Sequence, residues 1–327
     1  HNAHRFSIEW SRVEPKEGEW NEEAIEHYRK VIRALRARGM EPFVTLWHWT
    51  VPVWFAQNGG WQSPHAIDCF ERYVRKVVLL LRDDVHFWIT LNEPEIFAIN
   101  TYLKGAWPPQ RKSVTGYFHC VQTLIRAHKR AYHAIKESSH HASVGTARDL
   151  VYFDRYDNKI IDFIFRKPLD WWWNYYFFDK FVRHQDFIGI NSYFRKRIGL
   201  KKARNVSDMG WRIYPKTLYH SLVGLKKYGI PVYVTEHGLA DADDSRRASF
   251  ITESLRYLHS AIAKGVQVKG YLHWSLLDNF EWDKGFWPRF GLVEVDFKTQ
   301  KRTIRPSAYE YAKICRENAL EANYESV

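Results

Sequence analysis

Two patterns in the amino-acid sequence predict an α/β protein of the TIM (β/α)8-barrel type. Short apolar segments rich in β-branched residues alternate with longer amphipathic segments along all 327 residues, which is the order of a parallel sheet whose strands are joined by helices. Several apolar segments end in polar residues just before a loop, as strands do at the C-terminal face of such a barrel. No change in composition marks a boundary, so residues 1–327 are predicted to form one barrel domain.

The individual elements follow from periodicity and from the residues that stop them. The predicted strands cover residues 4–10, 41–49, 87–91, 142–153, 186–194, 231–236 and 268–276. The predicted helices cover residues 21–38, 66–81, 114–137, 215–228, 245–264 and 306–319; Asn21 can cap the first of them and Gly39 stops it. A closed barrel of this type needs one strand more than the seven recognisable here, and we expect that strand to precede residue 1.

The chain carries a net charge of +12, from 49 basic and 37 acidic residues, which raises the question of a nucleic-acid partner. The basic residues are spread along the polar faces of predicted helices, and no RNA-binding motif or basic tail accompanies them. We therefore predict a solvated basic surface and no nucleic-acid partner. Tryptophan is abundant, with 15 copies, but it suits sugar rings and protein cores equally, so composition alone does not choose between them.

The three cysteines, Cys69, Cys120 and Cys315, lie far apart and show no metal-ligand spacing. This pattern predicts reduced thiols, a cytoplasmic location and no bound metal. His140 and His141 are predicted to lie in a surface turn, because no third ligand stands at metal-binding spacing. We see no signal peptide and no apolar segment long enough to span a bilayer, so we expect no membrane partner. The oligomeric state is not predicted.

Two predicted strands end in the same way, with a glutamate followed by a strand-breaking residue. They are Phe87-Trp88-Ile89-Thr90-Leu91-Asn92-Glu93-Pro94 and Pro231-Val232-Tyr233-Val234-Thr235-Glu236-His237-Gly238. Proline cannot continue a central strand, so Glu93 should lie at a strand mouth, where poor solvation raises the pKa of a carboxyl group. Two such glutamates facing each other across a barrel mouth would form the carboxylate pair that glycoside hydrolysis needs. The alternative is that each glutamate caps a helix or pairs with a nearby arginine.

Several separated motifs resemble, in the same order, the signatures of family 1 glycoside hydrolases, the β-glucosidase family. They are Arg5-Phe6-Ser7-Ile8-Glu9-Trp10, Thr45-Leu46-Trp47-His48-Trp49, Thr90-Leu91-Asn92-Glu93-Pro94, Thr235-Glu236-His237-Gly238, Trp274-Ser275-Leu276-Leu277-Asp278-Asn279-Phe280-Glu281-Trp282 and Arg289-Phe290-Gly291. The resemblance covers essentially the whole chain, and it implies a (β/α) barrel with O-glycosyl hydrolase activity.

The resemblance also implies a retaining two-glutamate mechanism that needs no cofactor. Glu93 would be the general acid/base and Glu236 the nucleophile that forms a covalent glycosyl-enzyme, with the two carboxyl groups about 5 to 5.5 Å apart. Arg5, Asn191 and Tyr193 would support Glu236 in its ionised and oriented form. The residues implied to bind the sugar are His48, Asn92, Trp274, Glu281, Trp282 and Phe290.

Glu281 also bears on the choice of substrate. In the branch of the family that acts on phosphorylated sugars, the Glu281-Trp282 position is replaced by a phosphate-binding set, and the carboxylate of a glutamate would repel a phosphate. We therefore expect a small unphosphorylated β-glycoside as substrate: a β-glucoside, or else a β-fucoside or β-galactoside.

The sequence departs from the family pattern in three respects. The family's first strand has no counterpart, residues 194–211 form a short link, and Ser192 and His237 replace an aromatic residue and an asparagine. Either these residues are part of a longer chain, or the barrel is shortened and another chain, a rearranged segment or an apolar ligand covers its open seam. The second case leaves an alternative function open: a weakly active or degenerate barrel that binds a sugar or a flat apolar ligand such as a porphyrin.

Overall fold

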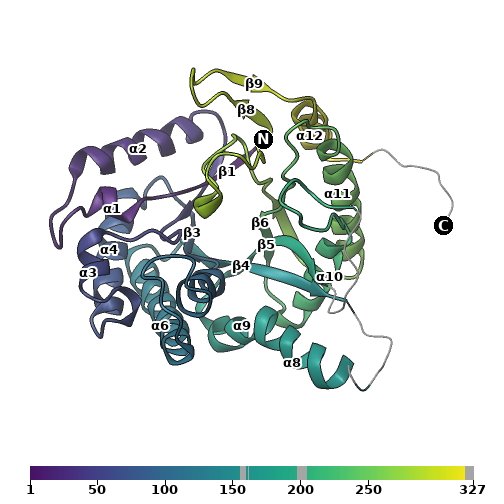
Figure 1. The fold of residues 1–327 in the computed structure, drawn as a ribbon. Coiled ribbons are helices and arrows are strands. Elements are labelled where there is room, and N and C mark those ends of the chain that lie inside the picture. Colours follow the sequence, from purple (N-terminus) through teal and green to yellow (C-terminus); the bar gives the residue numbers. More distant parts are fainter. Residues whose placement is uncertain (155–159, 161, 197–204, 321–327) are drawn as a thin grey trace. The chain divides into compact units, whose positions relative to one another are not determined.

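The computed structural model describes residues 1–154, 160, 162–196 and 205–320 (Figure 1). Seven strands follow one another through a single sheet in chain order. They are β1 (Ala3–Ser7), β2 (Glu41–Thr45), β3 (Phe87–Asn92), β4 (Ser143–Phe153), β5 (Phe187–Lys196), β6 (Val232–Glu236) and β7 (Val268–Tyr271). The seven predicted strands are thereby confirmed, with helices between them in the order that a (β/α) barrel requires.

The helices also follow the prediction, and shorter ones join them. The α-helices are α1 (Trp10–Val13), α2 (Glu22–Arg36), α3 (Val53–Gln57), α4 (Ala66–Leu81), α5 (Pro94–Ala98), α6 (Val114–Ser138), α8 (Lys167–Asp170), α9 (Tyr176–Phe181), α10 (Thr217–Leu225), α11 (Arg247–Ala263) and α12 (Pro306–Glu317). Short 3-10 and π turns are η1 (Gly60–Gln62), η2 (Ile99–Leu103), η3 (Asp162–Arg166), η4 (Trp171–Tyr175), η5 (Val182–His184), η6 (Lys226–Tyr228) and η7 (Trp282–Lys284). Asn21 caps α2 as predicted, because its side-chain oxygen accepts the backbone N–H of Ala24.

Three strands end earlier than predicted. β1 ends at Ser7 because the chain turns into α1, where the carboxylate of Glu9 caps the helix by accepting the backbone N–H of Ser11. β2 ends at Thr45, and the backbone of Trp49 is left-handed with φ 76°. β7 ends at Tyr271, so residues 272–276 belong to a loop. Polar residues predicted to end these strands therefore lie in loops that start at the strand ends.

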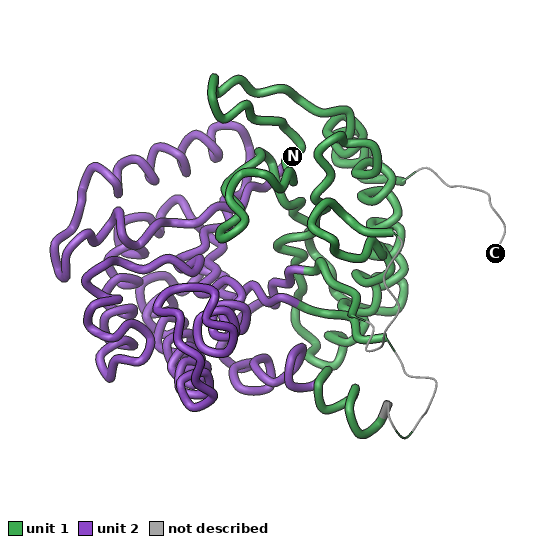
Figure 2. Tube along the Cα trace, in the orientation of Figure 1, with its two compact units in different colours: residues 1, 150–170, 192–327 green, residues 2–149, 171–191 purple. Residues whose placement is uncertain are grey.

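The chain divides into two compact units, coloured separately in Figure 2. Unit 2 comprises residues 2–149 and 171–191 and contains the parallel pairs β1–β2, β2–β3 and β3–β4. Its core is aromatic: the fully buried Trp10 stacks on Tyr73 and packs against Phe55 and Phe70. These four aromatic residues therefore supply a packed core.

Unit 1 comprises residue 1, residues 150–170 and residues 192–327. It contains the parallel pair β6–β7 and packs α11 against both α10 and α12. It also contains an antiparallel hairpin of β8 (Val293–Val295) and β9 (Arg302–Ile304), which was not predicted because strands of three residues are too short for alternation to be visible. The prediction of one barrel domain stays a prediction.

Two smaller predictions, on the cysteines and on the His140-His141 turn, are confirmed. Cys69, Cys120 and Cys315 are free thiols, and His140 and His141 are exposed in a turn. Within the ranges given above, no helix combines the length and the hydropathy needed to cross a bilayer. The same described residues contain no cluster of three or more His, Cys, Asp or Glu side chains suited to a metal ion.

Candidate active site

The backbone around Glu93 makes a sharp turn at the end of β3. Glu93 has a left-handed conformation with φ 40°, and Pro94 then begins α5. The backbone N–H of Glu93 donates to the carbonyl of Ala147 on β4 at 2.8 Å. The strand thus ends where proline was expected to stop it, and the glutamate side chain is 6% exposed.

Asn92 is the centre of a polar cluster beside this turn. Its Oδ1 accepts hydrogen bonds from Nη2 of Arg5 at 2.6 Å and from Nδ2 of Asn191 at 3.1 Å. Because arginine can only donate, the oxygen of the amide must face Arg5. The Asn92 Nδ2 therefore faces Nε2 of His48, 3.0 Å away, and donates to it.

His48 is a neutral imidazole in this arrangement. Burial holds the pKa of His48 well below its usual value of 6.5, and the positive charge of Arg5 lowers it further. Since Nε2 accepts a hydrogen bond from Asn92, the ring proton must be on Nδ1. In this cluster Arg5 therefore carries a positive charge and His48 does not.

Asn191 and Trp49 hold Glu93 directly. The second Nδ2 hydrogen bond of Asn191 goes to Oε1 of Glu93 at 2.7 Å. The indole Nε1 of Trp49 donates to the carbonyl of Asn92 at 2.9 Å and to that of Glu93 at 3.3 Å. The role of Trp49 was missed, although its position at the end of the motif Thr45-Leu46-Trp47-His48-Trp49 was a signal for it.

A second glutamate, two residues after Glu93, was also missed. Glu95 is 3% exposed, and its Oε2 accepts a 2.8 Å hydrogen bond from Nε of the fully buried Arg148 on β4. Its Oε1 accepts the backbone N–H of Asp149, also at 2.8 Å. An arginine inside the apolar run of β4 was the available signal, but the sequence did not identify its partner.

Glu236 ends β6 in unit 1, and its side chain is 5% exposed. The phenol of Tyr193 donates to Oε2 of Glu236 at 2.9 Å, the contact that a role in supporting this carboxylate requires. The Tyr193 ring meets the rings of Trp211 and Phe290 edge to face, at 5.8 and 6.3 Å between centroids. These aromatic contacts fix the direction from which the phenol reaches the carboxylate.

The loop after β7 starts with a close approach to the end of β6. The backbone N–H of Trp274 donates to the carbonyl of His237 at 3.1 Å. A Cβ atom on Gly238 would lie 1.8 Å from the carbonyl oxygen of Trp274, so only glycine permits this approach. The peptide bond between Trp274 and Ser275 is cis.

Glu281 lies further along the same loop. Its backbone N–H donates to the carbonyl of Gly285 at 2.7 Å, which closes a tight turn around Trp282. Burial, together with the negative charges of Glu236 and Asp283, raises the pKa of Glu281 to about 7. The charge of Glu236, in the same unit, therefore disfavours ionisation of Glu281.

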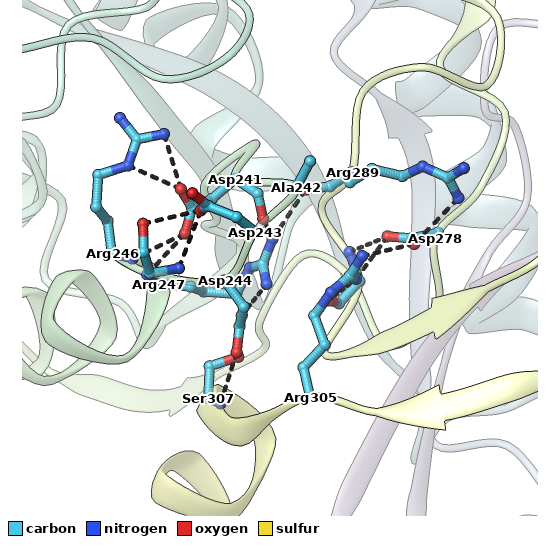
Figure 3. A network of polar contacts seen from close by, with 12 residues as sticks. Asp241, Ala242, Asp243, Asp244, Arg246, Arg247, Asp278, Arg289, Arg305 and Ser307 are labelled. Atoms are coloured by element: carbon cyan, nitrogen blue, oxygen red, sulfur yellow. Dashed lines mark hydrogen bonds and ion pairs between the residues drawn. The ribbon is translucent and has the colours of Figure 1, made fainter.

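Asp278 anchors this loop through a network of arginines, which Figure 3 shows. Its Oδ1 accepts from Nη1 of Arg305 and from the backbone N–H of Gly291, both at 2.9 Å, and its Oδ2 accepts from Arg305 at 3.0 Å and from Arg289 at 3.2 Å. Burial alone would raise the pKa of Asp278, but the hydrogen bonds and charge of Arg305 outweigh burial and lower it.

The loop after β6 is anchored in the same region (Figure 3). Oδ2 of Asp241 accepts the backbone N–H groups of Arg246 and Arg247 at 2.9 and 3.1 Å. Asp244 accepts both the hydroxyl and the backbone N–H of Ser307 at the start of α12, at 2.7 and 2.9 Å. The segments that follow β6 and β7 are thus tied to the C-terminal helix by charged hydrogen bonds.

The structure distributes the predicted site residues over the two units. The Glu93 cluster, in unit 2, consists of Arg5, His48, Asn92, Glu93 and Asn191; the Glu236 cluster, in unit 1, consists of Tyr193, Glu236, Trp274, Glu281, Trp282 and Phe290. The contacts described for Arg5 and Asn191 are to Asn92 and Glu93. Their predicted support of Glu236 stays a prediction.

Comparison with known proteins gives one family throughout. The model of glycosyl hydrolase family 1 matches residues 1–197 and 161–320. β-Glucosidase A of Thermotoga maritima is 32% identical over 371 residues, a match that covers 98% of this chain and 83% of that protein. The chloroplast galactolipid galactosyltransferase of Arabidopsis thaliana is 34% identical over 344 residues, covering 97% of this chain and 55% of that one.

Solved structures agree in fold as well as in sequence. The β-glycosidase from Pyrococcus horikoshii superimposes with a TM-score of 0.93 at 36% identity, covering 98% of this chain and 82% of that chain. This likeness confirms the TIM-barrel fold class and, with the relatives above, an O-glycosyl hydrolase of the β-glucosidase type. The chain belongs to glycosyl hydrolase family 1.

Proposed function

We propose that the protein is a retaining β-glycosidase of unphosphorylated β-glucosides, with β-fucosides and β-galactosides as further substrates. The observation that carries the proposal is the state of the two strand-end glutamates. Glu93 and Glu236 are both buried, and each accepts a hydrogen bond from a neutral donor, Asn191 or Tyr193. Buried carboxyl groups that are oriented by a fixed hydrogen bond suit proton transfer and nucleophilic attack.

Glu93 acts as the general acid/base. Its Oε1 accepts an amide hydrogen of Asn191, which orients the carboxyl group that carries the transferable proton. In the first step Glu93 gives this proton to the leaving oxygen as the glycosidic bond breaks. In the second step it takes a proton from the attacking water, which restores the acid.

Glu236 acts as the nucleophile and forms the covalent glycosyl-enzyme. The hydrogen bond from Tyr193 orients the carboxylate that attacks the anomeric carbon. Retention of configuration requires the two carboxyl groups to lie about 5 to 5.5 Å apart, since no water molecule fits between nucleophile and sugar in that mechanism.

The remaining residues of both clusters bind the sugar. Asn92 uses one amide hydrogen on His48 and has a second to offer to the 2-hydroxyl, whose hydrogen bond strengthens in the transition state. Trp274, Trp282 and Phe290 supply apolar faces for the ring. Glu281 accepts hydrogen bonds from outer hydroxyl groups and repels a phosphate on the sugar.

Hydrolysis of 4-nitrophenyl β-glucoside tests the proposal, with Glu93→Ala and Glu236→Ala as variants and exposed Glu294→Ala as the matched control. We expect both site variants to lose activity by orders of magnitude and the control to match wild type. Azide should restore turnover of an activated substrate by Glu93→Ala, because the anion attacks the glycosyl-enzyme without a general base. An inert wild type, or site variants that match the control, would overturn the proposal.

The stereochemistry and the acceptor need separate measurements. Proton NMR of the first sugar released should show the β-anomer, and a first-formed α-anomer would rule out the retaining mechanism. One relative is named a galactosyltransferase, so free sugar and nitrophenol should be measured together. Equal amounts support hydrolysis, whereas a deficit of free sugar would indicate transfer to another acceptor. A 6-phosphoglucoside should be a poor substrate if Glu281 excludes phosphate.

A further inference from the structure

We propose that Glu95 and Arg148 are a positioning pair that holds the turn of Glu93, and that they govern proton donation to the leaving group. The inference rests on the proposed role of Glu93 as general acid/base. Neither residue belongs to the clusters described above, and all the contacts involved lie inside unit 2.

Three consecutive residues of β4 hold both ends of the turn. The carbonyl of Ala147 accepts the backbone N–H of Glu93, and the backbone N–H of Asp149 donates to Glu95, each at 2.8 Å. Between them, Nε of Arg148 donates to the other carboxylate oxygen of Glu95, also at 2.8 Å. The segment from Glu93 to Glu95 is therefore clamped to one rigid strand at its first and third residues.

The turn needs such a clamp. Glu93 has φ 40°, a left-handed conformation that costs free energy for any residue except glycine and persists only where surrounding contacts enforce it. The backbone N–H groups of Ile96 and Phe97 in α5 donate to the carbonyl of Glu93 at 3.1 and 3.2 Å, which joins the turn to the helix but not to β4. Of the contacts described above, the carboxylate of Glu95 is the side chain that fastens α5 to β4.

Arg148 is itself fixed from three sides. Its Nη2 donates to the carbonyl of Trp173 at 3.0 Å, and its guanidinium carbon lies 4.1 Å from the ring centre of Phe177 and 5.2 Å from that of Phe178. Burial raises the pKa of Glu95, and the charge of Arg148 opposes this rise. A buried ion pair of this kind usually contributes less to stability than apolar residues of the same size would, so its value lies in fixed geometry.

The chemistry of glycoside cleavage offers a readout specific to this role. A leaving group of high pKa cannot depart without a proton from Glu93, whereas 2,4-dinitrophenolate departs unprotonated. Misplacing the carboxyl group of Glu93 should therefore slow cleavage of an alkyl glucoside and leave the first step with a dinitrophenyl glucoside nearly unchanged. A loss of folded protein, or a general loosening of the site, would slow both substrates by the same factor.

The test is Glu95→Gln, which keeps the size of the side chain and its acceptor for the Asp149 N–H but removes the charge. We expect kcat/KM for methyl β-glucoside to fall at least about tenfold, within the range that general acid catalysis supplies, and kcat/KM for 2,4-dinitrophenyl β-glucoside to change less than about threefold. The matched control is Glu14→Gln, which removes another buried carboxylate of unit 2, one paired with Arg72 at 2.7 Å.

Each outcome decides one question. An equal loss on both substrates by Glu95→Gln, or the same substrate dependence in Glu14→Gln, would overturn the inference. Glu93→Gln separates the two proposals: if it loses activity equally on both substrates, the proposed function fails, and if it alone shows the dependence, only the positioning role fails. Should Glu95→Gln not fold, Arg148→Lys keeps the charge but loses the planar contacts, and the same substrate dependence is expected.

Discussion

Replacing Glu281 by glutamine should stabilise the protein at alkaline pH and have little effect at acidic pH. The reason is the environment of the carboxyl group: burial raises its pKa to about 7, and the charges of Glu236 and Asp283 oppose its ionisation as well. Glutamine has the same shape and has no charge to bury. The site therefore holds a group that is suited to binding hydroxyls and that costs stability when it ionises.

The size of the effect follows from proton linkage. The pKa of this carboxyl group is 4.5 in an unfolded chain and about 7 in the folded protein. Between these values the unfolded state loses its proton while the folded state keeps it, so the stability of the wild type falls as pH rises. At about 1.4 kcal/mol per pKa unit, the penalty reaches about 3 kcal/mol by pH 8, but stays near 1 kcal/mol at pH 5.

Urea titrations of wild type and Glu281→Gln at pH 5 and pH 8 measure this difference directly. The variant should exceed wild type in free energy of unfolding, and this excess should be about 2 kcal/mol larger at pH 8 than at pH 5. The variant should also lose activity. Glu310→Gln, an exposed glutamate on α12 of the same unit, is the control and should change little at either pH. A stabilisation by Glu281→Gln that is equal at the two pH values would refute the reasoning, because only titration of this group makes the gain depend on pH.

Four further substitutions test other contacts of unit 1. Tyr193→Phe removes the hydrogen bond to Glu236 and should lower kcat about 10- to 100-fold, the usual worth of a hydrogen bond to a charged group; unchanged kinetics would contradict the support of the nucleophile. Gly238→Ala forces a Cβ against the carbonyl of Trp274, so the thermal midpoint and the activity should both fall. Arg305→Met removes two hydrogen bonds to Asp278 and should lower the free energy of unfolding in urea by about 3 kcal/mol. A loss smaller than about 1 kcal/mol would argue against this anchor. His237→Asn should lower stability and leave the pH dependence of kcat/KM unshifted.

The strand ends that carry Glu93 and Glu236 could be predicted because local chemistry determines them. Pro94 and Gly238 interrupt strong apolar, β-branched segments, and neither interruption depends on distant residues. The bounds of α4 were likewise readable from its apolar periodicity. The order of strands and helices, and from it the barrel class, followed from these local signals.

What could not be predicted depends on contacts between distant residues. β7 ends at Tyr271 because the next segment turns toward β8, where Val293 donates its backbone N–H to Leu276. The hydrogen bond from Asn191 to Glu93 spans 98 residues in sequence, and the pairing of Glu95 with Arg148 spans 53. A sequence displays each of these residue types, but it does not display which ones meet.

His237 replaces the asparagine of the family motif without adding a charge. Burial lowers the pKa of its imidazole to about 3, so the ring is uncharged throughout the working range of a glycosidase and cannot adjust Glu236 by its charge. Its ring instead stacks on Phe250 at 4.8 Å, and its Nδ1 lies 3.0 Å from the phenol oxygen of Tyr271. Asparagine could replace the hydrogen bond but not the stacked ring. The histidine therefore contributes packing next to Glu236. Its backbone carbonyl accepts the N–H of Trp274, and this contact links the ends of β6 and β7.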